Sequence, residues 1–254
     1  MSITRYPLAV LVVSFVGLSL AAWIGATFLR RFHGPEGKPG DSYGTTLAAT
    51  LTLLGLIIGF TFSMAVSRYD QRKNLEEEEA NAIGTEYVRA GLLPAADAAK
   101  TRALLRAYLD QRVLFYIARD ETGMGAINAR TAQLQNELWN VVQAAATAQP
   151  TPTVALAVAG MNDVLNSQGY TQAAWWNRIP PGAWLLMTAI ALLCNLLVGF
   201  GSTRAEGRNL LLLVLPTSLS ISFFLIADID SPRHGVIRIA PQNLHSVVDS
   251  LRIP

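Results

Sequence analysis

Apolar residues gather in four long runs that alternate with polar stretches along this chain of 254 residues. Each run holds about twenty apolar residues, the length that a helix needs to cross a hydrocarbon core of about 30 Å. The predicted spans are residues 8–29, 45–66, 181–200 and 210–227. We therefore expect an integral membrane protein with four transmembrane helices.

Short connections join these spans in pairs. Glycine and proline residues between positions 30 and 44 favour turns, and a tight loop with Arg204 and Arg208 separates the last two spans. We therefore expect two transmembrane hairpins, over residues 1–66 and 181–227.

The polar stretch between the hairpins, residues 67–180, repeats its apolar positions with the period of a helix. The second span is expected to continue as one helix to about Leu93, because the residue before Pro94 is biased away from helical geometry. Further helices are expected over residues 98–119, 130–146 and 152–166. The sequence thus predicts an all-α membrane protein with a cytoplasmic helical insert over residues 67–180 and a cytoplasmic C-terminal segment over residues 228–254.

Composition and charge exclude several classes of protein. The net charge is only +2 and 51% of the residues are hydrophobic, so the chain lacks the basic surface that nucleic-acid binding needs. The single cysteine, Cys194, rules out a disulfide framework within one subunit. His33, His234 and His245 are far apart and show no zinc-binding spacing, and no catalytic motif is present. We expect no enzyme, no cofactor and no metal site.

The second span has two chemically different faces. At 100° per residue, small and polar side chains fall on one face and large apolar side chains on the other. The first face carries Thr45, Ala48, Ala49, Thr52, Leu56, Gly59, Ser63, Ser67 and Asp70, with Phe60 at its edge. Such a stripe either lines a water-filled pore or, through the Gly55-x-x-x-Gly59 pair, lets helices pack closely.

A family resemblance rests on the same span. Gly59-Phe60 followed after seven residues by Arg68-Tyr69 resembles the signature of bestrophins, and the layout of two hairpins around a helical insert is also similar to theirs. Residues 59–93, together with the segment from Asp228 to Gly235, resemble the bacterial membrane proteins called bestrophin-like, and this likeness extends over most of the chain.

The resemblance implies a pentameric ion channel in the bacterial inner membrane. The side of the termini carries seven Lys and Arg residues near the membrane against five on the other side, so we expect cytoplasmic termini. In bestrophins the pore neck is made by three apolar side chains of the second helix, and the corresponding positions here are Thr52, Leu56 and Phe60. Thr52 departs from the apolar rule, so a neck that is more readily wetted at that level is one expectation. The partners implied are the lipid bilayer, further copies of the chain and small monovalent ions.

Four charged residues near the membrane are candidates for charge selectivity or for ion pairs. Arg68 either attracts anions or pairs with Asp228 or Asp230 after the fourth span. Glu79, in the run Glu76 to Glu79, either belongs to a solvated face or forms an acidic ring that favours cations. The two aspartates are expected to serve turn and ion-pair chemistry, and calcium gating is not implied, because the dense carboxylate run of animal bestrophins is missing.

Two functions remain open from the sequence. One is passive conduction of ions through an oligomeric pore lined by the second span. The alternative is a non-conducting scaffold or sensor that binds a partner through its cytoplasmic helices. A transporter is disfavoured because the four spans lack buried ionisable residues.

Overall fold

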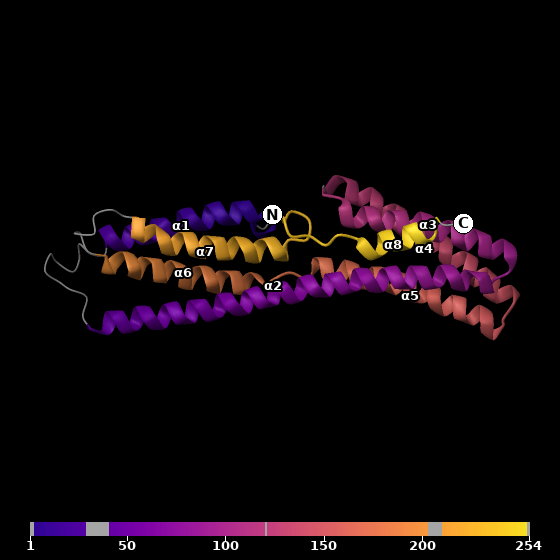
Figure 1. The fold of residues 1–254 in the computed structure, drawn as a ribbon, viewed down its shortest axis with the longest axis horizontal. Coiled ribbons are helices and arrows are strands. Elements are labelled where there is room, and N and C mark those ends of the chain that lie inside the picture. Colours follow the sequence, from indigo (N-terminus) through magenta and orange to yellow (C-terminus); the bar gives the residue numbers. More distant parts are fainter. Residues whose placement is uncertain (1–2, 29–40, 120, 203–209, 253–254) are drawn as a thin grey trace. The chain divides into compact units, whose positions relative to one another are not determined.

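The computed structural model describes residues 3–28, 41–119, 121–202 and 210–252, and over these residues it is helical with no strand (Figure 1). The expected all-α class and the four apolar spans are confirmed. Arg30, Arg31, His33, Lys38, Arg204 and Arg208, with the turns expected around them, lie outside the described residues. The elements are η1 (Ile3–Arg5), α1 (Pro7–Thr27), α2 (Asp41–Arg89), η3 (Ala90–Leu92), α3 (Ala95–Ile117), α4 (Glu121–Ala148), α5 (Pro152–Trp176), α6 (Pro181–Gly201), α7 (Leu210–Asp230) and α8 (Gln242–Ser250).

The chain divides into two compact units. The first, here called the span unit, comprises Met1–Arg68 and Arg178–Ile237, and the second, the bundle unit, comprises Tyr69–Asn177 and Arg238–Pro254. Helix α2 contributes residues to both units. The C-terminal segment is divided as well, because residues 228–237 belong to the span unit and the rest belongs to the bundle unit.

In the span unit, α1 packs against both α6 and α7. Two glycines make the closest approach between α1 and α6. A Cβ atom on Gly25 would collide with the carbonyl oxygen of Leu196, and one on Gly199 would collide with that of Ala22. Without a strong hydrophobic drive inside lipid, helices associate through such close backbone packing.

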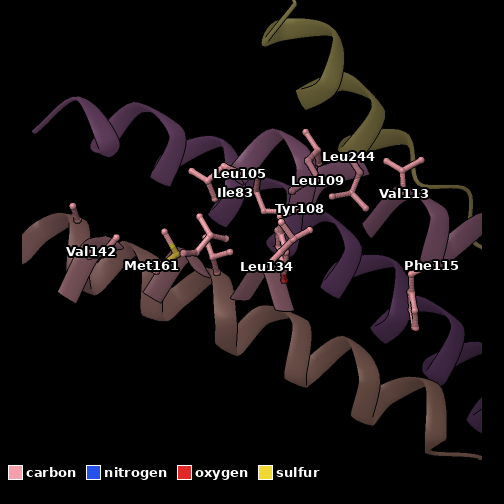
Figure 2. Packing of buried hydrophobic residues seen from close by; sticks show 14 of the residues in the cluster. Ile83, Leu105, Tyr108, Leu109, Val113, Phe115, Leu134, Val142, Met161 and Leu244 are labelled. Carbon is pink, nitrogen blue, oxygen red and sulfur yellow. The ribbon is translucent and has the colours of Figure 1, made fainter. Parts of the chain in front are cut away.

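In the bundle unit, α3, α4, α5 and α8 enclose a hydrophobic core together with the second half of α2 (Figure 2). The helices begin where the sequence breaks: Pro94 precedes α3, and the Thr151 hydroxyl accepts a hydrogen bond from the Val154 backbone N–H at the start of α5, 3.3 Å away. The most deeply buried core residues include Ile83, Leu105, Tyr108, Leu109, Phe115, Leu134, Met161 and Leu244.

Candidate functional site

Helix α2 has one covered face and one open face within the span unit. Leu54, Thr61 and Ala65 are buried and recur at helical spacing, so they mark the covered face. The residues that the sequence assigns to the pore stripe lie on the opposite face and are all exposed in the single chain. They are Thr45, Thr52, Leu56, Gly59, Phe60, Ser63 and Ser67.

This open face is large and partly apolar. Leu56 is 53% exposed and Phe60 is 66% exposed. Only 17% of the apolar window of α2 is buried, against 28%, 33% and 44% in the other three candidate spans. The span part of α2 is therefore the least covered of the four apolar segments, and its open face is free to meet lipid, water or another copy of the chain.

Several threonine hydroxyl groups of α2 are satisfied by the backbone of their own helix. The Thr52 hydroxyl donates to the Ala48 carbonyl oxygen at 2.9 Å, and Thr46 and Thr50 make the same bond one turn back along α2. A threonine bonded in this way keeps its hydroxyl oxygen as an acceptor, so Thr52 is compatible both with lipid and with water.

The glycine pair of α2 makes no close helix contact with the described residues of its own chain. No heavy atom outside the local helix backbone lies within 4 Å of where a Cβ atom would stand on Gly55 or Gly59. The close glycine contacts between α1 and α6 lie at Gly25 and Gly199, and Gly201 on α6 lies against the Tyr43 side chain of α2. A packing role for the α2 pair therefore has no partner among the described residues of one chain.

One end of α2 is attached to α6 by Tyr43, which sequence reasoning missed. The Tyr43 hydroxyl donates to the Leu197 carbonyl oxygen at 2.5 Å, and its ring lies 5.8 Å from the ring of Phe200. The only signal in the sequence is an aromatic residue at the start of a span, which is typical of membrane interfaces.

Arg68 lies on the covered side of α2. It is sixteen residues after Thr52, which places it about 160° around the helix from that threonine. Among the described residues it forms no ion pair with Asp228 or Asp230, and its Nη1 atom is buried without a hydrogen-bond partner. The expected pairing of Arg68 with these aspartates is therefore not what the structure has.

The two aspartates instead organise the turn after α7. The Asp228 carboxylate accepts hydrogen bonds from the backbone N–H groups of Val236 and Ile237, at 2.7 and 2.8 Å. Asp230 accepts from the N–H of Ile179 and pairs with Arg178, whose Nε lies 3.4 Å from its Oδ2 atom. Both aspartates are buried, and no group of metal-ligating side chains is found among the described residues.

The run of four glutamates is split between two environments. Glu77 and Glu78 are exposed, as expected for a solvated face, whereas Glu76 and Glu79 are buried. The Glu76 carboxylate accepts hydrogen bonds from the backbone N–H of Leu244 and the side-chain amide of Asn243, at 2.9 and 2.7 Å, and so caps the start of α8.

Glu79 is neither on a solvated face nor open to water, because it forms a buried ion pair. Its carboxylate bonds to the Arg112 guanidinium, and both side chains are fully buried. The hydroxyls of Tyr116 and Thr171 also donate to it, at 3.3 and 3.2 Å. Burial and the Glu79 charge raise the pKa of Tyr116, which therefore stays a neutral donor. Glu79 lies about 180° from Thr52 by rotation along α2, so it does not share a helix face with the predicted pore stripe.

Acidic residues do occur on the open face of α2 beyond the span. Asp70 and Glu77 are exposed and lie within about 20° of Thr52 by rotation along the same helix. The exposed residues Asn74, Asn81, Thr85 and Val88 follow at the same helical spacing. The sequence stripe already contained Asp70 but stopped there, so Glu77 was missed, although the same rotation would have found it.

Comparisons with known proteins agree with this architecture. A model of the bestrophin-like domain matches residues 13–244. A point mutant of a bacterial bestrophin homologue from Klebsiella pneumoniae superposes with a TM-score of 0.66 at 14% identity, covering 95% of this chain and 97% of that one. The homologue solved by Zn-SAD phasing gives a TM-score of 0.62 at 15% identity, over 95% and 94%. No curated protein matches the chain.

Proposed function

Because this chain belongs to the bestrophin-like family, we propose that it is a passive channel for small monovalent ions, formed by a ring of copies that turn the open face of α2 inward. The ring is a pentamer by family resemblance. We place it in the bacterial inner membrane, with the bundle unit and both termini in the cytoplasm. Conduction of this kind involves no catalytic step, cofactor or resident metal.

The observation that carries the proposal is the open face of α2 in the single chain. A face that mixes hydroxyls and glycine with Leu56 and Phe60 is neither a uniform lipid-facing surface nor a covered one. The described residues of one subunit leave this face exposed, so a closed ring of identical copies is needed to enclose water along it.

The neck of the pore is assigned to Thr52, Leu56 and Phe60. These residues are spaced by four, so in a ring they form three stacked layers. The Phe60 and Leu56 layers are apolar, and an apolar constriction controls conduction by losing its water. The Thr52 layer offers hydroxyl oxygens and is wetted more easily.

The charge on the same face favours cations. Asp70 and Glu77 are exposed acids near the centre of the open side of α2, and Arg68 lies on the covered side. The exposed Lys73 lies about 60° from Thr52, so two acids stand against one lysine on this side. Rings of carboxylates along a pore raise the local concentration of cations and exclude anions.

The test is the current of purified protein in planar bilayers under a KCl gradient. We expect wild type to conduct with a reversal potential of the sign that a potassium-selective pore gives. We expect Phe60→Ala to raise the conductance. Phe62→Ala is the matched control, because Phe62 is the same residue type, is 42% exposed and lies off the stripe. Equal conductance in wild type, Phe60→Ala and Phe62→Ala would reject the neck assignment.

The second candidate is the scaffold or sensor, favoured by the local hydrogen bonds of the α2 threonines. Since Thr52 needs no water to satisfy its donor, the open face is also suited to packing or to lipid. A stable, uniform oligomer that stays silent in bilayers, both as wild type and as Phe60→Ala, would support this function over conduction.

A further inference from the structure

Glu86 is a buried carboxyl group that none of the roles described above uses. It lies on the covered side of α2 inside the bundle unit and is 0% exposed. Both of its carboxyl oxygens are buried and have no hydrogen-bond partner among the described residues. Buried carboxylates are normally paired or hydrogen-bonded, as Glu76 and Glu79 are in this unit, so a carboxyl group without donors requires an explanation.

The Glu86 carboxyl group lies directly against α5 at Gly160. A Cβ atom on Gly160 would collide with the Glu86 Oε2 atom and would stand 2.7 Å from the Arg89 Nη1 atom. The absence of a side chain at position 160 is therefore what leaves space for the carboxyl group and for the guanidinium beside it.

Two charged side chains, Arg89 and Asp163, act directly on Glu86, and a third, Arg102, belongs to α3. Arg89 follows Glu86 on α2, and Asp163 lies one turn after Gly160 on α5. The Arg89 Nη1 atom lies 3.9 Å from the Asp163 Oδ2 atom, in a partly exposed ion pair. From α3, Arg102 is engaged elsewhere, since it donates to the Tyr87 carbonyl oxygen at 3.2 Å and stacks over the Tyr87 ring.

The protonation state of Glu86 follows from these surroundings. Burial raises the pKa of its carboxyl group to about 8, while the positive charge of Arg89 lowers the pKa and the negative charge of Asp163 raises it. At pH 7 about nine in ten of the side chains are then protonated and neutral. A neutral carboxyl group costs far less free energy to bury without partners than an ionised one does.

We propose that Glu86 is a proton-operated switch in the bundle unit. In the protonated state α2 and α5 pack closely at Gly160, and Arg89 pairs with Asp163. Loss of the proton to water leaves a buried anion whose nearest cation is Arg89, so the guanidinium shifts from Asp163 to Glu86 and the α2–α5 contact loosens. Because α2 also carries the candidate pore face, this step would let cytoplasmic alkalinity alter conduction, and that last consequence rests on the proposed function.

The first experiment follows the proton itself in the full-length protein. Infrared spectra from pH 5 to pH 10 report the C=O band of protonated carboxyl groups. Wild type should lose one such band near pH 8, Glu86→Gln should lack it, and Glu137→Gln should keep it, because Glu137 is a partly exposed residue on α4. A band that persists in Glu86→Gln, or that disappears near pH 4.5 in wild type, would overturn the switch.

A second readout is the stability of the folded protein. The Glu86 pKa is higher in the folded state than its ordinary value of 4.5, so the folded state gives up its proton later than the unfolded chain does. Stability then falls as pH rises from about 5 to about 8 and levels off above that range. The folded-to-unfolded ratio of wild type should fall about tenfold or more relative to Glu86→Gln across this range, and parallel curves would contradict the switch.

A third variant tests the exchange of partners. Asp163→Asn removes the negative charge that holds Arg89 and opposes ionisation of Glu86, so the infrared band should titrate at lower pH. An unchanged titration would show that Arg89 does not change partners.

Bilayer currents distinguish a failure of the Glu86 switch from a failure of the proposed channel function. If wild type conducts and its current changes between pH 7 and pH 9 only while Glu86 is present, both proposals stand. If the infrared titration appears in a protein that never conducts, the switch stands and the channel fails. If the protein conducts without the titration, the switch fails alone.

Discussion

The covered face of α2 is built differently in the two units. In the span unit it buries Leu54, Thr61 and Ala65, whereas in the bundle unit it buries Arg72, Glu76, Glu79 and Glu86. The polar members of the second set are tolerated because most have partners: Arg112 for Glu79, the start of α8 for Glu76, and the Ala174 carbonyl oxygen for Arg72. A buried helix face can therefore carry apolar or charged side chains, and which of the two it carries depends on the residues that pack on it.

The largest expected effect on stability comes from breaking the buried ion pair between Glu79 and Arg112 in the bundle unit. Arg112→Met leaves the Glu79 carboxylate buried with only the hydroxyl donors of Tyr116 and Thr171, and should cost roughly 3–5 kcal/mol of unfolding free energy. Denaturant unfolding in detergent measures this loss. The double variant Glu79→Leu with Arg112→Met should recover most of it, and equal losses in the single and double variants would show that the lost packing, not the unpaired charge, sets the cost.

The next effect tests the close packing of the span unit. Gly199→Ala places a methyl group against the Ala22 carbonyl oxygen and should cost roughly 1–3 kcal/mol through forced separation of α1 and α6. Thermal unfolding in micelles measures it. Gly17→Ala on α1 and Gly55→Ala on α2 are the controls, because neither glycine has a heavy atom within 4 Å of the added carbon, and a loss as large in Gly17→Ala would refute the argument.

A smaller effect concerns the attachment of α8 in the bundle unit. Glu76→Ala removes the acceptor for the Leu244 backbone N–H and should cost about 1–2 kcal/mol, seen as faster hydrogen exchange in α8. Glu78→Ala, two residues along the same run and exposed, should leave that exchange unchanged. Equal exchange in the two variants would mean that apolar contacts alone hold the helix.

The smallest effect concerns the open face of α2. Glu77→Gln and Asp70→Asn should each reduce the preference for cations by a few fold, an energy of about 0.5–1 kcal/mol for charges in contact with water. Reversal potentials under a KCl gradient measure this, with Glu137→Gln as the control away from α2. If neither variant moves the reversal potential, both carboxylates lie outside the path of the ions.

Sequence reasoning succeeded where one helix contains the whole signal. The rotation of α2 separates Leu54 from Thr52, and the structure buries the first and exposes the second. It failed for Glu79, because a run of glutamates is usually solvated and the partner that makes burial possible, Arg112, lies thirty-three residues away in the sequence. Gly25 and Gly199 were missed for the same reason, because each glycine is needed only where the backbone of the opposite helix comes close.

The sequence by itself determined the all-α class, the four apolar spans and the two faces of α2, because hydrophobic length and helical periodicity are properties of a single segment. The tertiary structure alone decided which charges are buried and what neutralises them. It paired Asp230 with Arg178 instead of Arg68, placed Glu79 on Arg112, and left Glu86 beside Gly160 without a donor. The physical reason is that the free energy of a buried charge depends on donors supplied by other helices, and no local pattern specifies those contacts.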